Sequence, residues 1–317
     1  MLALDKKSDL YNAINKFSTQ FDEGFRIAEH IRFPKGVDNI VIATYGIAAS
    51  TAQLVLDMFA DELKDKKITI SPHYDLPNNA ASDTLVVGID IEKDHPAVMT
   101  STKKAYDKKA NIVSVVTGGK LENYTRNRKL GIVKVDDHID YMNLQIYSGL
   151  LIGIIVQILI GANFLNNKAK FKILELTQEL EKMYLTKLGE KLAGQIEDST
   201  VLIYAEPALS GMMQLIKSNL NISLNIPVFH QTLPKAFGDE LIGFGKKNFA
   251  KYKALFLMDS ETNEKYKKDF EIAGKLLDQS KVKHEIWELP GRNRKLSLLA
   301  GTILTYWTTY WLQEKAR

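Results

Sequence analysis

The chain has 317 residues, of which 45% are apolar and 25% charged, with 19 glycines and 8 prolines. These fractions are typical of a globular protein with a sizeable core, and they exclude a disordered chain and a small disulfide-held module. The formal net charge is only +4 and no basic patch stands out, so we expect no nucleic-acid partner. The absence of cysteine excludes thiolate nucleophiles and Cys-based metal sites.

The chain begins without the apolar segment of a secretory signal, so we expect a cytoplasmic protein. The most apolar stretch, residues 148–165, is about long enough to cross a bilayer. It contains Ser148, Gln157 and Asn163 together with three glycines. This polar content predicts a buried core helix, and we expect no membrane contact.

Short apolar runs rich in β-branched residues alternate with segments of helical periodicity along the whole chain. Unbroken runs of this kind predict strands covered on both faces, and their alternation with helices predicts mainly parallel, doubly wound sheets. The predicted strands are residues 38–44, 84–89, 111–116, 131–135, 201–204, 226–229, 254–258 and 283–287. We therefore predict an α/β protein with two flavodoxin-like domains, residues 1–166 and 167–317.

Three long amphipathic segments, residues 8–31, 168–192 and 295–313, are predicted to form helices. The second lies near the expected domain boundary. The third carries aromatic residues at spacings of three and four, namely Tyr306, Trp307, Tyr310 and Trp311. Such a stripe indicates packing in the core or at a subunit interface rather than ligand stacking.

Ligands of doubly wound sheets bind at the carboxyl ends of the strands, so the loops there hold the candidate site residues. The first strand is followed by Thr44 and Gly46, and the next helix begins with Ser50 and Thr51 close behind. Free N–H groups at a helix start favour an anion, and the hydroxyls suit that use. The alternative is an ordinary turn in which Ser50 or Thr51 caps the helix.

The loop after residues 84–89 is acidic, because it places Asp90, Glu92, Asp94 and His95 within six residues. These oxygen ligands suggest a metal site, but the turn glycine and the distal glutamate of a calcium loop are missing. We favour a solvated acidic loop that leads into a helix beginning at Pro96.

Other candidates lie at later strand ends. Thr117 and Lys120 flank two glycines and would offer a hydroxyl and a cation to a ligand. In the second half, His230 and Glu240 could serve as acid and base, with Lys217 to stabilise negative charge. A purely structural role for each, and for the nearby Glu206, remains the alternative, because spacing alone does not define their mutual geometry.

The order of these segments resembles the sugar isomerase (SIS) superfamily, and within it the dual-specificity phosphoglucose/phosphomannose isomerases. VIATYGIAAST resembles the glycine-rich turn of that family, VTGGKL resembles its Thr-Ser-Gly-Gly-Lys-Leu, and LPKAFGDELIGF resembles its Leu-Pro-Glu-Ala-x-His-Asn-Glu-Ile-Val-Gly-Trp. The terminal TYWTTYWL is similar to the family's last helix. The resemblance implies two SIS domains and a sugar or sugar-phosphate ligand. We also expect no cofactor, and a homodimer that uses residues 148–165 or the aromatic C-terminal helix at its interface.

The functional residues of that family are the ones that this chain lacks. The acid/base glutamate falls on Ile222, the ring-opening histidine on Gly238, and the arginine near Met142. The phosphate-binding hydroxyls fall on the acidic loop. A carboxylate about 4 Å from a phosphate charge costs roughly 1 kcal/mol in water and about 4 kcal/mol in a partly desolvated site.

Two functions follow from these comparisons. The family function is isomerisation of glucose-6-phosphate or mannose-6-phosphate, with Glu240 and His230 as relocated acid and base. Ligand contacts would then come from Thr44, Gly46, Ser50, Thr51, Thr117, Lys120 and Lys217. The alternative, which the residues favour, is a non-catalytic SIS scaffold that binds a less anionic sugar derivative or a protein partner.

Overall fold

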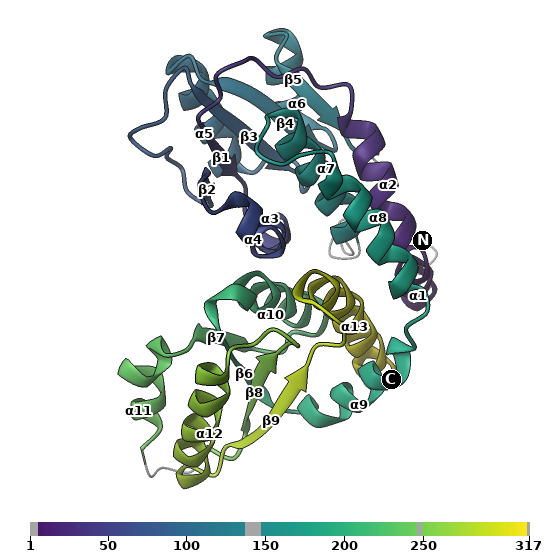
Figure 1. Ribbon diagram of the computed structural model, residues 1–317, viewed down its shortest axis with the longest axis vertical. Helices are drawn as coiled ribbons and strands as arrows, with labels where there is room; N and C mark the ends of the chain where they lie inside the picture. The colour runs from purple at the N-terminus through teal and green to yellow at the C-terminus, as the bar shows by residue number, and fades with distance from the viewer. Residues whose placement is uncertain (1–5, 137–146, 246–248, 316–317) are drawn as a thin grey trace. The chain divides into compact units, whose positions relative to one another are not determined.

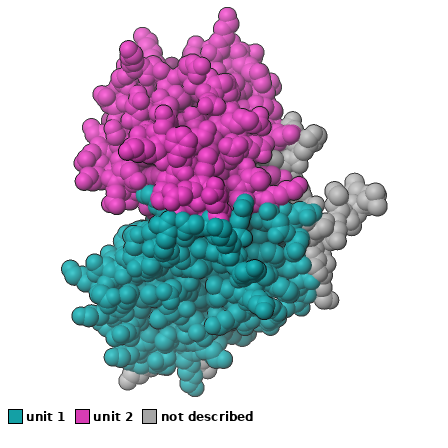
Figure 2. All heavy atoms as spheres, turned by 45° about the vertical axis from the view of Figure 1, so that its right-hand side comes forward, with its two compact units in different colours: residues 1–15, 179–317 teal, residues 16–178 magenta. Residues whose placement is uncertain are grey.

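The computed structural model describes residues 6–136, 147–245 and 249–315 of the chain. The chain forms two compact units, which Figure 2 shows in different colours. Unit 2 consists of residues 16–178, and unit 1 combines residues 1–15 with residues 179–317. Unit 1 is thus discontinuous in sequence, whereas the predicted division lies at 166/167. Each unit is described by itself below.

Unit 2 contains a five-stranded sheet with the order β2-β1-β3-β4-β5, in which every neighbouring pair is parallel. Four strands match predicted runs, and β2 is additional. The K-I-T-I-S sequence of β2 alternates polar and apolar residues because this edge strand is partly exposed. The strands are β1 (Asn39–Ala43), β2 (Lys67–Ser71), β3 (Thr84–Asp90), β4 (Asn111–Val116) and β5 (Gly131–Lys134).

Seven helices of the described residues surround or extend this sheet (Figure 1). The apolar stretch forms α7, whose residues are buried along most of its length, as predicted. It packs closely on α2 through Gly24 and Gly153. The helices are α2 (Phe17–Ala28), α3 (Gly46–Met58), α4 (Ala60–Leu63), α5 (Pro96–Asp107), α6 (Gly119–Asn127), α7 (Ser148–Gly161) and α8 (Lys168–Leu180).

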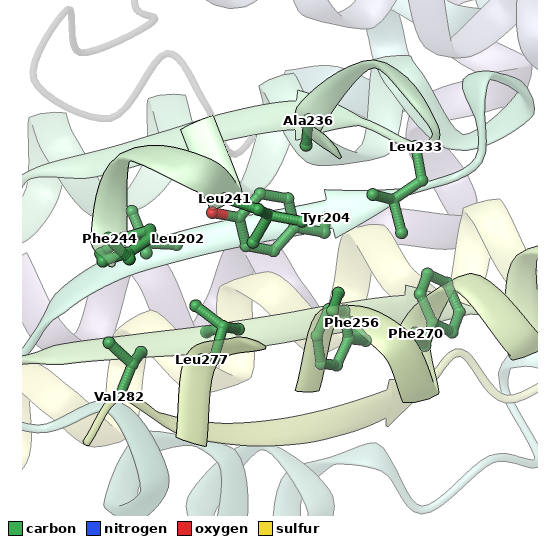
Figure 3. Packing of buried hydrophobic residues seen from close by; sticks show 12 residues of the cluster. Leu202, Tyr204, Leu233, Ala236, Leu241, Phe244, Phe256, Phe270, Leu277 and Val282 are labelled. Carbon is green, nitrogen blue, oxygen red and sulfur yellow. The ribbon is translucent and has the colours of Figure 1, made fainter. Parts of the chain in front are cut away.

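Unit 1 contains a four-stranded parallel sheet with the order β7-β6-β8-β9. One face of this sheet is covered by a core of buried residues that includes Tyr204, Phe256 and Phe270 (Figure 3). Its strands are β6 (Thr200–Ala205), β7 (Val228–Thr232), β8 (Tyr252–Met258) and β9 (Lys283–Glu288). Its helices are α1 (Lys6–Asn15), α9 (Leu185–Ile196), η2 (Pro207–Leu209), α10 (Ser210–Leu224), η3 (Lys235–Gly238), α11 (Glu240–Phe244), α12 (Glu264–Gln279) and α13 (Arg294–Lys315).

Two of the predicted long helices are each interrupted, and these predictions were wrong. The segment 8–31 divides into α1 and α2 at Lys16, and each part packs in a different unit. The segment 168–192 divides into α8 and α9, and Tyr184 between them is 92% exposed. An amphipathic pattern continues across such a break because both helices bury an apolar face.

The aromatic stripe of α13 packs inside unit 1. The rings of Tyr11 on α1 and Trp307 meet edge to face, with centroids 5.6 Å apart. The indole Nε1 of Trp311 donates a hydrogen bond to the carbonyl oxygen of Thr186 at 3.1 Å. The stripe therefore joins α13 to α1 and α9, which agrees with the packing role predicted for it.

Both sheets are parallel and doubly wound, with helices on their faces, so the predicted α/β fold class is confirmed. None of the helices within the described ranges combines the length and the apolarity that a membrane crossing requires.

Candidate functional site

The strand order of unit 2 places a topological switch point between β1 and β3, where doubly wound sheets bind ligands. Two aromatic rings bridge this crevice. Tyr45, which follows β1, stacks on His95, which follows β3, with ring centroids 3.3 Å apart and an interplanar angle of 19°. Burial, followed by the charges of Glu92 and Asp90, raises the pKa of Tyr45 above its ordinary value. The phenol therefore stays protonated at neutral pH.

The carboxylates of the acidic loop face two helix N-termini in this crevice. Asp94 Oδ1 accepts a hydrogen bond from the backbone N–H of Lys120, in the first turn of α6, at 2.5 Å. A Cβ on Gly119 would lie 2.6 Å from the same oxygen, so only glycine permits this approach. At the start of α3, a Cβ on Gly46 would lie 3.3 Å from Glu92 Oε1. Asp94 thus occupies the position at the N-terminus of α6 that favours an external anion, and Glu92 lies beside the start of α3.

The backbone of the acidic loop is strained to hold this arrangement. Lys93 and Asp94 have φ values of 62° each, in the left-handed region that non-glycine residues rarely adopt. Each such residue costs on the order of 1 kcal/mol. The contact between Asp94 and α6 stabilises a loop conformation that is unfavourable by itself.

The predicted anion-binding hydroxyls are engaged in structural hydrogen bonds. Ser50 and Thr51 donate to carbonyl oxygens four residues earlier, so the expectation that one of them caps the helix was wrong. The hydroxyls of Thr44 and Thr117 are buried and donate to carbonyls of the β3 segment. The donors and acceptors are Thr44 to Ile89 (3.2 Å), Ser50 to Gly46 (3.3 Å), Thr51 to Ile47 (2.9 Å) and Thr117 to Ile91 (2.9 Å).

The first residue of the acidic loop departs from the predicted solvated state, because Asp90 is fully buried. Its Oδ2 accepts the backbone N–H of His95 at 3.2 Å, while its Oδ1 has no hydrogen-bond partner. Burial raises the pKa of Asp90 to about 6. The helix beginning at Pro96 is confirmed. Within the described part of the chain, no group of His, Asp and Glu has the arrangement of a metal site.

Asp90→Asn is expected to stabilise unit 2 at pH 7.5 by about 2 kcal/mol, because it removes an ionised buried carboxylate and keeps the acceptor for His95. The folded-state pKa is raised, so the folded state binds the extra proton between about pH 4 and 6. Stability therefore falls as pH rises through this window, and the gain in the variant should shrink at pH 4.5. Urea unfolding at both pH values measures this.

The control for this prediction is Asp65→Asn, which alters an exposed carboxylate in the same unit. It should change the free energy of unfolding little at either pH. An equal effect of Asp90→Asn at pH 4.5 and 7.5 would show that ionisation of Asp90 is not the cause.

The switch point of the second sheet, between β6 and β8, is closed by an internal ion network. Arg294, at the start of α13, donates from Nε to Asp259 Oδ2 at 2.8 Å and from Nη2 to Asp259 Oδ1 at 3.1 Å. The same guanidinium pairs with Glu206. The side chain of Asp259 is fully buried and that of Glu206 is 6% exposed. This geometry supports a purely structural role for Glu206, which was the alternative given above.

The remaining candidates lie together in unit 1, around a cavity of about 450 Å³ that we call the β7 cavity. Lys217, His230 and Glu240 all contribute to its wall. The other lining residues are Leu202, Phe229, Gly243, Phe244, Phe249 and Tyr252. The cavity lies at β7, which is an edge strand of its sheet, so residues from both faces of the sheet can line it.

The candidate acid and base approach the β7 cavity from opposite faces of the sheet. The register pairs Phe229 with Leu202 and His230 with Ile203, and successive strand residues alternate in direction. His230 therefore lies on the α10 side with Lys217, and burial followed by the charge of Lys217 lowers its pKa. Glu240 lies on the other side, where its Oε1 accepts a hydrogen bond from the hydroxyl of Tyr204 at 2.8 Å.

The predicted site residues thus form two groups on different units. Thr44, Gly46, Ser50, Thr51, Thr117 and Lys120 lie in the segments that follow β1 and β4 in unit 2, and Lys217, His230 and Glu240 line the β7 cavity of unit 1. Ile222 is exposed on α10, and an added Cβ at Gly238 would meet no other atom within 4 Å. The position near Met142 lies outside the described residues.

Sequence reasoning missed four residues that shape these sites, namely Tyr45, Tyr204, Asp259 and Arg294. Asp259 directly follows a predicted strand, as ligand-binding acids do, and this position was a usable signal. Tyr204 closes a strand and gives no sign that its hydroxyl meets Glu240. The partners of Arg294 directly follow β6 and β8, two strands that are far apart in the sequence and that only the fold brings together.

Residues 186–315 match the family model of the bacterial phospho-glucose isomerase C-terminal SIS domain. The sequence has no match among curated proteins. The fold is similar to that of a provisionally named phosphosugar isomerase from Clostridium difficile 630, with a TM-score of 0.71, 12% identity and coverage of 96% of this chain and 93% of that chain.

Two further solved structures are similar over nearly the whole chain. The C-terminal domain of glucosamine-fructose-6-phosphate aminotransferase from Francisella tularensis has a TM-score of 0.68 and 10% identity, with 96% of this chain and 94% of that chain covered. Glucosamine-6-phosphate deaminase from Thermotoga maritima has a TM-score of 0.64 and 10% identity, with the same coverage of 96% and 94%. The predicted resemblance to the sugar isomerase (SIS) superfamily is thus confirmed: residues 186–315 are similar to the C-terminal SIS domain of bacterial phosphoglucose isomerase, and the whole chain shares its fold with the solved structures named above.

Proposed function

We propose that this chain is a cytoplasmic, homodimeric SIS protein that binds a ligand without isomerising phosphosugars. The observation that carries the proposal is the crevice of unit 2, where Glu92 and Asp94 face the helix N-termini. A phosphosugar would have to displace both carboxylates or accept their repulsion. The proposal is also supported by Ile222 and Gly238, which stand where the resembling family has its acid/base groups.

The pure protein is expected to show no turnover in a coupled assay of fructose-6-phosphate conversion to glucose-6-phosphate and mannose-6-phosphate. Millimolar phosphosugar should also leave its melting temperature unchanged. Turnover that disappears in Glu240→Gln or His230→Ala would contradict the proposal and identify a relocated base.

The second candidate function is therefore an isomerase that works from unit 1. It is favoured by one observation, which is that the β7 cavity brings Lys217, His230 and Glu240 to a single wall. Against it, His230 and Glu240 lie on opposite faces of the sheet, and the hydroxyl of Tyr204 already occupies an oxygen of Glu240. A base that moves a proton between adjacent carbons needs direct access to both.

Removing the two carboxylates of the crevice is expected to create phosphate affinity. In a Glu92→Ala, Asp94→Gly double variant, the N-termini of α3 and α6 lose their internal anions, and glycine suits the positive φ at position 94. We expect inorganic phosphate to bind at least about tenfold more tightly than to the wild-type protein, measured by calorimetry at low salt.

The matched control is Asp61→Ala with Asp65→Ala, which removes the same charge from exposed positions of the same unit. It should not increase phosphate affinity. If both double variants gain equally, net charge rather than the crevice is responsible. If neither gains, the acidic loop does not block an anion site.

A further inference from the structure

The β7 cavity has the size of a small-molecule site. Its volume of about 450 Å³ lies within the usual range of ligand pockets, roughly 300–1,000 Å³. The switch point of unit 1 is closed by the ion network of Arg294, whereas the β7 cavity is open to a ligand.

Three aromatic side chains form a fixed wall of the cavity. Phe244, Phe249 and Tyr252 contact one another edge to face, with ring centroids 5.2–6.0 Å apart and interplanar angles of 79–90°. Each ring is held by the other two, so the wall is preorganised. Phe229 adds an apolar side chain that is 53% exposed at the edge of the sheet. A flat ligand that covers these rings gains apolar contact at small conformational cost.

The polar groups of the cavity balance in charge. Lys217 supplies one positive charge and Glu240 one negative charge, while His230, with its lowered pKa, is neutral at pH 7. The Tyr204 hydroxyl holds the Glu240 carboxylate in one orientation. The ammonium group donates hydrogen bonds and the carboxylate accepts them, which suits hydroxyl groups because a hydroxyl does both. An anionic group would be attracted by the ammonium of Lys217 but repelled by the carboxylate of Glu240.

We propose that the β7 cavity binds an uncharged glycoside, with its flat group against the aromatic wall and its hydroxyls on Lys217 and Glu240. This inference rests on the proposed function and names its ligand class. The carboxylate and the ammonium select the hydroxylated ring, while Phe229 and the aromatic wall select the flat group attached to it. The β7 cavity belongs to unit 1, whereas the acidic loop belongs to unit 2.

The test uses p-nitrophenyl β-D-glucopyranoside as the probe and its 6-phosphate as the charged counterpart, with binding followed by calorimetry and saturation-transfer NMR. We expect the uncharged probe to bind and the phosphate to bind more weakly. Phe229→Ala should weaken binding of the uncharged probe by about tenfold, and Lys217→Met by a similar factor. Both substitutions change partly exposed side chains, and a thermal melt of each variant confirms that it folds.

The matched control is Ile286→Ala, on the opposite edge strand β9, where the side chain is 57% exposed. It should leave probe binding unchanged. Tighter binding of the phosphate, equal binding in Phe229→Ala, or no binding at all would overturn the assignment. The isomerase assay on the same preparations separates the two proposals, because turnover refutes the proposed function, whereas absence of both turnover and binding refutes only the cavity assignment.

Discussion

Arg294→Leu is expected to lower the free energy of unfolding of unit 1 by about 3–5 kcal/mol, the cost of removing one partner from a buried ion network. The guanidinium compensates the side chains of Asp259 and Glu206, which are 0% and 6% exposed. Without it, two carboxylates stay buried in one place with no cation between them. Burial already raises the pKa of Glu206 above its ordinary value, even with Arg294 present. Chemical denaturation of the intact chain measures the loss.

The matched control for this experiment lies two residues away. Arg292 forms a similar pair with Glu179, but the two side chains are 52% and 32% exposed. Arg292→Leu should therefore cost less than about 1 kcal/mol. If both substitutions cost the same, the network at the switch point is no more important than a surface pair. A second variant, Asp259→Asn with Arg294→Gln, should restore part of the loss, because it removes a buried negative charge together with the positive one.

Gly153→Ala is expected to lower the free energy of unfolding of unit 2 by about 3 kcal/mol, although alanine is the better helix former. An added Cβ would collide with the carbonyl oxygen of Phe21 and would lie 3.0 Å from the Cα of Gly24. Both neighbours are backbone atoms of α2, so relief requires α2 and α7 to move apart. Separation would loosen the buried packing along both helices.

Gly238→Ala serves as the control, because an added Cβ there meets nothing within 4 Å and the backbone does not have a positive φ. It should change the free energy of unfolding by less than about 0.5 kcal/mol. Urea unfolding followed by far-UV circular dichroism compares the two variants. A stable Gly153→Ala protein would show that α2 and α7 are not in close backbone contact.

The fold could be predicted from sequence because most of its strands are short apolar runs, and the central strands, such as β3 and β6, are buried on both faces. All eight predicted strands are present, with small shifts at their ends such as β7, which begins at Val228 rather than residue 226. The strand that was missed, β2, is half exposed, so its alternating pattern is weak. The helix breaks at Lys16 and near Tyr184 were also missed, since helical periodicity shows which face is buried but not whether the axis is continuous.

The candidate site could be predicted only in part. The acidic loop and its repulsion of an anion could be predicted, because they depend only on the type and order of the residues. The contact of Asp94 with the first turn of α6, by contrast, depends on the unusual backbone at Lys93 and Asp94. The burial of Asp90 follows from its place as the last residue of β3, a strand that is buried along its whole length. Side-chain direction in a loop is decided by tertiary contacts, which no local pattern records.

The discontinuity of unit 1 has a consequence for how the chain is made. During synthesis α1 emerges before unit 2, but the helix that it packs on, α13, emerges after unit 2 and after the strands of unit 1. All residues of unit 2 are synthesised before any strand of unit 1, so unit 2 can fold while α1 still lacks the helix on which it packs. Completing unit 1 then closes a loop that contains the whole of an already folded unit 2. A compact insert shortens the effective length of that loop, and the entropic cost of bringing the two ends of the chain together falls accordingly.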